Sequence, residues 1–435
     1  MLSRIRYFLA DLGHWLSRSR WRLAGALAAL LVLAAAGVGG YLLAGDGGGT
    51  DPPSAPAPEV IVSEAPQPEA AEDVGFPAFA TANTTRVAGA DPATIAAGVA
   101  LAVHPSTGGV PGPDAVTLVD AADWAGGVAA ASLVADPVGA PILVTDGDEV
   151  PELTASALEA LAPAGSPATD GARAFAVAPA AAPDDLEALA IEGANPAEVA
   201  AEIEELRATL AGEPEHIVLA SSDEPQYAMP AAGWAARSGD PILFAQRESL
   251  PQATRQALRR NSDVPVYVLG PPSVISEEVV DEVGEIAASV ERVGGEDPVE
   301  NAIEFARYAD GSFGWDINDP GHGIVIANGD RPLDAGVAAP LSAAGTWGPL
   351  LVTDDAAALP APLSAYLLDL KPGYEDDPTR AIYNHAWLIG DAEALSVDLQ
   401  AEVDDLAALV PVTSGRGGGG SSPEEPELEP DEDED

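Results

Sequence analysis

The sequence contains no cysteine and a single lysine, Lys371, among its 435 residues. Without cysteine the protein has no disulfide, no thiolate nucleophile and no cysteine-ligated zinc. Lysine and arginine together number 19, against 70 aspartate and glutamate residues, and the net charge is -51. Because this charge repels phosphate backbones, the composition excludes nucleic acid as a partner.

Familiar catalytic motifs are also missing. The α/β region described below contains no HExxH zinc motif, Walker A loop, GxGxxG fingerprint or nucleophile elbow. The histidines are scattered, with no cluster at metal-ligand spacing. They are His14, His104, His216, His322 and His385. We therefore expect no catalytic residues, no metal site and no cofactor.

The longest apolar run lies near the N-terminus. Residues 23–45 carry no charge, and a helix of this length spans a bilayer core. Arginines precede the run and acidic residues follow it, so the positive-inside rule places residues 1–22 in the cytoplasm. We predict a transmembrane signal anchor at 23–45, with a cleaved signal peptide as the alternative.

Two polar segments flank the rest of the chain. Residues 46–80 are rich in Pro, Ala and Glu without sustained periodicity, which is typical of an extended linker. Residues 414–435 combine glycine and serine with a run of acids and have almost no apolar side chains, so we expect a disordered acidic tail. The folded part is therefore expected between residues 81 and 413.

Internal repetition is the strongest pattern in that part. The segment Arg86–Pro92 matches Arg292–Pro298, and Ala190–Pro196 is a weaker copy between them. The copies recur at intervals of about 100 residues. We predict module 1 at 81–188, a degenerate module 2 at 189–288, and module 3 at 289–413.

Each copy contains three short apolar runs separated by helical segments. The first runs are rich in β-branched residues, the second open with proline, and the third close each copy. They are Val116–Val119, Ile217–Ala220 and Ile324–Ala327; then Pro141–Val144, Pro241–Phe244 and Pro349–Val352; then Ala174–Val177, Val266–Gly270 and Ala386–Gly390. Strands alternating with helices at this spacing predict parallel βαβ units, so the fold class is α/β in three tandem modules.

With these motifs the chain resembles the cell wall-binding repeat 2 family over about residues 84–411. The resemblance rests on the Arg86–Pro92 opening, the strand at Val116, the Gly127–Ala130 turn into a helix, and the Pro-Ile-Leu and closing strands. Copy three repeats these features, including Asp334–Ala339, whereas copy two lacks that turn. The family implies Rossmann-like or Toprim-like modules that pack in threes and hold an anionic wall polymer.

The resemblance places the polymer groove near the Pro-Ile-Leu segments. The candidate residues are Pro141, Ile142, Leu143, Pro241, Ile242, Leu243, Pro349, Leu350 and Leu351. Apolar runs of this kind are equally typical of buried sheet interiors. In copy two, Gln246 and Arg247 follow the strand and add a cationic group that suits an acidic ligand, whereas copies one and three have carboxylates there.

Acidic residues follow two of the first strands. Asp120 with Asp123, and Asp330 with Asp334, lie where open α/β sheets usually place ligands. Capping of the next helix by aspartate explains these positions equally well. The residues therefore leave open an extracytoplasmic enzyme or small-ligand receptor built on the same scaffold.

Together these patterns predict a noncatalytic, membrane-anchored surface protein with its modules outside the cell. Its expected partner is an anionic wall polysaccharide or peptidoglycan-linked polymer, with divalent cations bridging the two acidic surfaces. A further alternative is a purely structural acidic surface protein without wall affinity.

Overall fold

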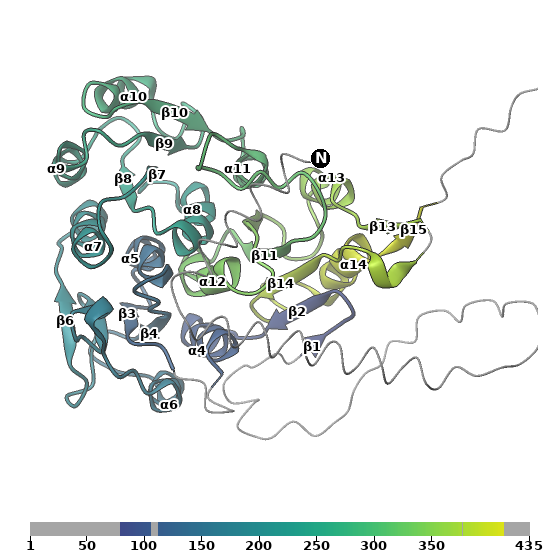
Figure 1. The fold of residues 1–435 in the computed structure, drawn as a ribbon, viewed down its shortest axis with the longest axis horizontal. Coiled ribbons are helices and arrows are strands. Elements are labelled where there is room, and N and C mark those ends of the chain that lie inside the picture. Colours follow the sequence, from purple (N-terminus) through teal and green to yellow (C-terminus); the bar gives the residue numbers. More distant parts are fainter. Residues whose placement is uncertain (1–78, 106–111, 376, 413–435) are drawn as a thin grey trace, which may run out of the picture. The chain divides into compact units, whose positions relative to one another are not determined.

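The computed structural model describes residues 79–105, 112–375 and 377–412 (Figure 1). The predicted cytoplasmic segment at 1–22, the membrane helix at 23–45 and the acidic tail at 414–435 lie outside these residues. So does the predicted linker at 46–80, except for its last two residues. Within the described ranges, no helix is long and apolar enough to cross a membrane.

Three parallel sheets of similar design form the framework. Sheet 1 has the order β4(Ile142–Thr145), β3(Val116–Asp120), β5(Ala174–Val177), β6(Ala188–Ile191). Sheet 2 has the order β8(Ile242–Ala245), β7(Ile217–Ser221), β9(Val266–Leu269), β10(Val290–Val293). Sheet 3 has the order β12(Leu350–Thr353), β11(Gly323–Asn328), β14(His385–Ile389), β2(Thr84–Val87), β1(Phe79–Ala80), in which only β1 is antiparallel. The predicted parallel α/β modules are confirmed.

The opening strand of each repeat pairs with the sheet of the preceding repeat. Strand β6 lies beside β5, and β10 lies beside β9. Strand β2, near the start of the described chain, lies beside β14, near its end. The three sheets are therefore linked in a closed cycle. The module boundaries at 188/189 and 288/289 stay predictions based on the sequence repeats. In the structure, the opening strand of each repeat pairs with the sheet of the preceding repeat, so the sheets and the sequence repeats divide the chain at different places.

Helices connect the strands. The longer ones are α4(Pro92–Val103), α5(Trp124–Ala130), α6(Glu152–Leu161), α7(Pro196–Ala211), α8(Pro225–Ser238), α9(Gln252–Arg260), α10(Glu277–Gly284), α11(Pro298–Arg307), α12(Leu333–Ala343), α13(Ala361–Asp369) and α14(Val397–Ala407). Short elements complete the fold: η1(Ala131–Val134), η2(Pro167–Thr169), η3(Pro378–Arg380), β13(Gly373–Tyr374) and β15(Val410–Pro411).

Each copy of the repeated opening motif ends where a helix begins. Asp91, Asn195 and Asp297 are the N-caps of α4, α7 and α11, and each side chain accepts a hydrogen bond from a backbone N–H in the first turn. Proline follows each cap at the first helical position, where its missing N–H costs nothing. The Asp/Asn-Pro pair therefore recurs because three equivalent helices begin there.

The helices that follow the first strands contact one another. Helix α12 packs on both α5 and α8, and α5 also packs on α8 (Figure 1). A Cβ added to Gly336 on α12 would lie 2.5 Å from the backbone carbonyl of Gly127 on α5, so these two helices touch through their backbones. On α8, a Cβ added to Gly233 would lie 2.8 Å from the Ser342 hydroxyl oxygen of α12. Small residues let one helix from each repeat meet at a common core.

Candidate functional site

The nine apolar candidate residues of the Pro-Ile-Leu segments are all buried. They open β4, β8 and β12, which are edge strands of their sheets. The carbonyl groups of Pro141, Pro241 and Pro349 each accept a hydrogen bond from the neighbouring first strand, at 2.8, 3.0 and 3.0 Å. An edge strand can begin with proline because its outer N–H has no partner strand to bond. These side chains belong to the sheet interior, and only the loops after them reach solvent.

Gln246 and Arg247, by contrast, are exposed. They form the start of a tight turn after β8, closed by backbone pairing between Gln246 and Ser249. The Arg247 N–H donates to Asp223 at 2.9 Å, and the Arg247 carbonyl accepts from Ser276 at 2.9 Å. The backbone of this turn is therefore fixed on both sides, while the guanidinium group extends into solvent.

Other arginines in this module are used within the fold. Arg255 of α9 forms an ion pair with Glu282. Arg260 donates to the buried Glu204 of α7 at 2.6 Å. Arg247 in the turn is therefore a better candidate for binding an acidic ligand than Arg255 or Arg260.

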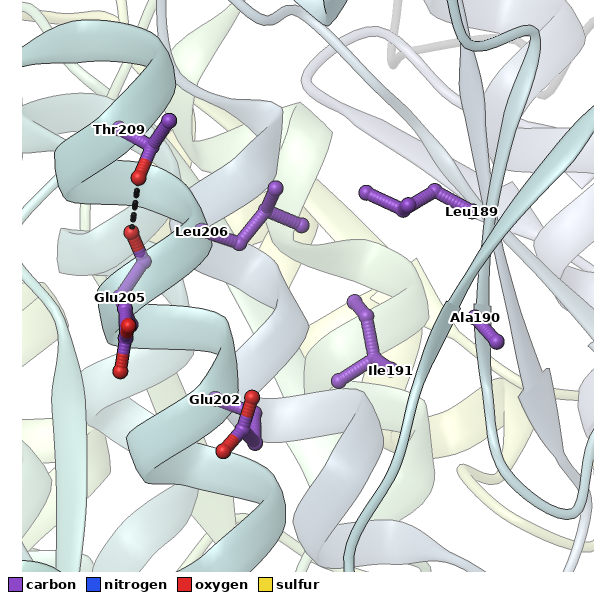
Figure 2. Close-up of a pocket in the computed structure, with 7 residues that line it drawn as sticks. All are labelled: Leu189, Ala190, Ile191, Glu202, Glu205, Leu206 and Thr209. Carbon is purple, nitrogen blue, oxygen red and sulfur yellow. Dashed lines mark hydrogen bonds between the residues drawn. The ribbon is translucent and has the colours of Figure 1, made fainter.

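A shallow hollow of about 200 Å³ lies between β6 and α7. Figure 2 shows Leu189 and Ile191 reaching from the strand toward Leu206 on the helix. The exposed carboxylates of Glu202 and Glu205 stand on its rim. An apolar floor with an acidic rim does not suit an anionic polymer.

Asp120 and Asp123 are engaged in local structure. Asp120 accepts from the N–H groups of Ala122 at 2.8 Å and Gly147 at 2.6 Å, which ties the loop after β4 to the end of β3. Asp123 is the N-cap of α5 and accepts from Gly126 at 2.8 Å. Burial raises the pKa of the Asp123 carboxyl. The helix-capping interpretation is confirmed for Asp123, whereas Asp120 bonds two loops and caps no helix.

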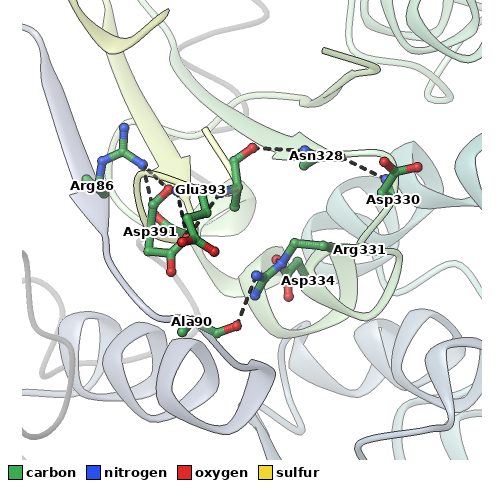
Figure 3. A network of polar contacts seen from close by, with 10 residues as sticks. Arg86, Ala90, Asn328, Asp330, Arg331, Asp334, Asp391 and Glu393 are labelled. Carbon is green, nitrogen blue, oxygen red and sulfur yellow. Dashed lines mark hydrogen bonds and ion pairs between the residues drawn. The ribbon is translucent and has the colours of Figure 1, made fainter. Parts of the chain in front are cut away.

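Asp330 and Asp334 behave differently from each other. Asp330 is exposed, whereas Asp334 lies fully buried in the first turn of α12 and pairs with Arg331 at 2.6 Å. Burial raises the pKa of Asp334 to about 6, although the hydrogen bond and the charge of Arg331 oppose this. Nothing among the described residues donates to Asp334 Oδ1. Arg331 also donates to the carbonyl of Ala90, so it links module 3 to the first opening motif (Figure 3).

Arg86 joins the same region from the other side (Figure 3). Its side chain is buried and donates to the carbonyls of Gly390 at 3.0 Å, Asp391 at 2.8 Å and Ser396 at 3.2 Å, and to Gln400 at 2.9 Å. Arg292 repeats this arrangement in sheet 2, where it donates to Gly270 and Ile275. In sheet 1 the equivalent position is Ala190. The repeated motif in the sequence marked the positions of Arg86 and Arg292. It did not show that each side chain binds the loop after the third strand of the neighbouring repeat, which is β14 for Arg86 and β9 for Arg292.

Within the described residues no group of three or more His, Asp or Glu side chains is arranged to hold a metal ion. The exposed acids therefore offer no preformed cation site in this part of the chain. Cation bridging stays a prediction about the complex.

These features define a class of protein: a cycle of three parallel α/β modules linked by shared opening strands, with helices meeting at a common core. Residues 190–280 match the model of the family Cell wall binding domain 2 (CWB2). The resemblance inferred from the repeats is confirmed, and the match falls on the copy that is most degenerate in sequence.

Two solved structures from Clostridium difficile are similar in fold. Cwp6 is 19% identical with a TM-score of 0.58, and the alignment covers 75% of this chain and 47% of that protein. Cwp8 is 17% identical with a TM-score of 0.58, and the alignment covers 75% of this chain and 52% of that protein. The chain thus spans about half the length of these proteins. No curated protein matches it in sequence.

Proposed function

We propose that this protein is a surface protein whose modules bind an anionic cell-wall glycopolymer without acting on it chemically. The observation that carries the proposal is the match of residues 190–280 to a cell wall-binding domain family. The closed cycle of three modules supports it, because all three would then be presented as one rigid unit.

Within that unit we place the first contact with the polymer at the turn containing Gln246 and Arg247. Arginine suits phosphate or carboxylate groups because its planar guanidinium donates two parallel hydrogen bonds. The turn lies inside the segment that matches the family, and both side chains are exposed. The apolar Pro-Ile-Leu residues would position the turns rather than touch the polymer.

Because the protein is strongly acidic, binding to an anionic polymer requires counter-ions between the two. A net charge of -51 opposes an anionic polymer at every distance within the Debye length. Exposed carboxylates such as Asp146, Asp354 and Asp355 follow the second strands of modules 1 and 3. Divalent cations shared between these groups and the polymer would reverse the repulsion.

We also propose that residues 23–45 anchor the protein in the membrane with residues 1–22 in the cytoplasm. This part of the proposal rests on the uncharged run and on the arginines before it. Membrane and wall would then hold the same molecule at two points.

Co-sedimentation with purified cell walls tests wall binding. A fragment of residues 64–435, which keeps all the described residues including β1 and β2, should pellet with walls in the presence of calcium. Binding should weaken when calcium is chelated and disappear after the anionic polymer is extracted. Absence of binding in every condition would contradict the proposal and favour a purely structural acidic surface protein.

A charge reversal tests the turn. Arg247→Glu should weaken wall binding about tenfold, equivalent to ~1.4 kcal/mol, because a carboxylate replaces the guanidinium. Arg259→Glu is the matched control, since Arg259 is an exposed arginine of α9 in the same module. Equal losses in both variants would mean that only net charge matters and that the turn is not a specific contact.

A further inference from the structure

Three residues far apart in the sequence meet at the amino end of sheet 2. Ser312 Oγ lies 3.1 Å from His216 Nε2, and His216 Nδ1 lies 3.2 Å from Asp240 Oδ2. His216 directly precedes β7, Asp240 precedes β8, and Ser312 lies in the loop between α11 and β11. This is the order of contacts in which a serine is activated by a histidine that an aspartate orients.

Hydrogen bonds hold Asp240 in the position that orients the imidazole of His216. Asp240 is buried and accepts hydrogen bonds from Trp234 Nε1 at 2.8 Å and from the His216 backbone N–H at 3.2 Å. The buried Arg207 also lies within electrostatic reach of Asp240. An ionised carboxylate at Nδ1 keeps the proton on that nitrogen, so Nε2 presents its lone pair to Ser312.

The imidazole ring is fixed by its neighbours. The rings of Tyr267 and Phe313 stand at 65° and 60° to it, with centroids 5.8 and 5.5 Å away. Only 9% of the His216 side chain is exposed. A ring packed in this way keeps its alignment with both partners at little further entropic cost.

The serine stands on a rigid, solvent-facing turn. Backbone hydrogen bonds of 2.8 and 2.9 Å between Asp310 and Phe313 close a two-residue loop, and Gly311 supplies the positive φ of 62° that its first position needs. Tyr267 donates to Asp310 at 2.9 Å and fixes the turn to sheet 2. Ser312 is exposed, so a substrate can approach this turn from solvent.

We propose that Ser312, His216 and Asp240 form a nucleophilic site that transfers acyl groups from esters. The Ser312 oxygen would bond to the ester carbonyl carbon while its proton passes to His216 Nε2. Collapse of the tetrahedral intermediate breaks the bond to the alcohol, which leaves with that proton. Water then attacks the acyl-serine, with His216 again taking and returning a proton, and releases the carboxylic acid.

The surroundings define the class of substrate. The N–H groups of Gly311 and Ser312 take no part in the two bonds that close the turn, and adjacent backbone N–H groups are the donors that stabilise an oxyanion. The Asp310 carboxylate stands beside the serine and disfavours anionic groups. An exposed turn suits a neutral ester, such as a short acyl group, carried on a flexible or polymeric molecule.

Labelling by a fluorophosphonate reagent tests the site without needing its natural substrate. The full chain in mild detergent should be labelled at Ser312 at least about 100-fold faster than at the exposed Ser262, as located by peptide mass spectrometry. Ser312→Ala should abolish this labelling and the acyl-enzyme burst with p-nitrophenyl acetate. Ser262→Ala is the matched control and should leave both unchanged.

Two further measurements separate activation from accessibility. His216→Gln should slow labelling of Ser312 about 100-fold or more, because the general base is lost. If circular dichroism shows that this variant does not fold, the relative labelling rates of Ser312 and Ser262 in the unsubstituted chain decide the question. Equal reactivity of Ser312 and Ser262, or a labelling rate unchanged in a folded His216→Gln variant, would overturn the proposal. Neither result bears on wall binding.

Discussion

Asp334 is the residue whose environment has the clearest thermodynamic consequence. Its carboxyl is buried, and its pKa is about 6 in the folded protein against an ordinary value of 3.8. Between these two pH values the folded state binds more protons than the unfolded state, so the unfolding free energy falls as pH rises through that window. Below it the carboxyl is protonated in both states, and above it ionised in both.

Replacing Asp334 with Asn should remove this dependence. Relative to the variant, the unsubstituted protein should gain about 2 kcal/mol of unfolding free energy when pH is lowered from 7.5 to 4.5. Urea denaturation at the two pH values measures the difference. Asp330→Asn removes an exposed carboxylate from the same loop and serves as the control; a variant that keeps the full pH dependence would show that Asp334 is not its source.

Residue-level reasoning from sequence succeeded for some aspartates and not for others. Asp123 caps α5, which the sequence allowed because capping depends on neighbours within a few residues, whereas the bond from Gly147 to Asp120 joins residues 27 positions apart. The pairing of Asp334 with Arg331 is equally local, but its burial is not, because α5 and α8 cover α12. The contacts of Ser312, His216 and Asp240 left no local pattern in the sequence at all.

At the scale of elements, the contact between α5 and α12 depends on glycine. Gly336→Ala should lower the unfolding free energy by about 1–3 kcal/mol, because the added Cβ would press on the Gly127 backbone and force the helices apart. Thermal or urea unfolding measures this loss.

Gly284→Ala is the matched control for that prediction. Gly284 is the last residue of α10, and a Cβ there would meet only the Val290 side chain, at 3.9 Å. Alanine restricts the unfolded chain, so this variant should be unchanged or up to about 1 kcal/mol more stable. If both substitutions had the same effect, close helix contact would not be the cause of the loss at Gly336.

At the scale of the whole molecule, the cycle closes through Arg86. This residue lies in the first repeat, yet its side chain donates to the loop and helix after β14. Arg86→Ala should cost about 3 kcal/mol or more, because several buried acceptors lose their donor. Hydrogen exchange should rise in residues 385–407, about 300 residues along the chain from the substitution.

Arg292→Ala is the internal comparison. It removes the equivalent donor from sheet 2, so exchange should rise in residues 266–284 instead. A response of Arg86→Ala confined to residues 84–92 would contradict closure of the cycle through this side chain.

The sequence by itself determined the class of fold, because strands, helix caps and repeat spacing are encoded within stretches of a few dozen residues. Runs such as Ile324–Ala327 are apolar throughout since both faces of a parallel strand are buried. Only the tertiary structure decided which repeat each opening strand completes, that the Pro-Ile-Leu side chains are interior, and that Ser312 meets His216. Those outcomes depend on which elements pair and pack in space, and hydrophobic periodicity carries no information about such pairings.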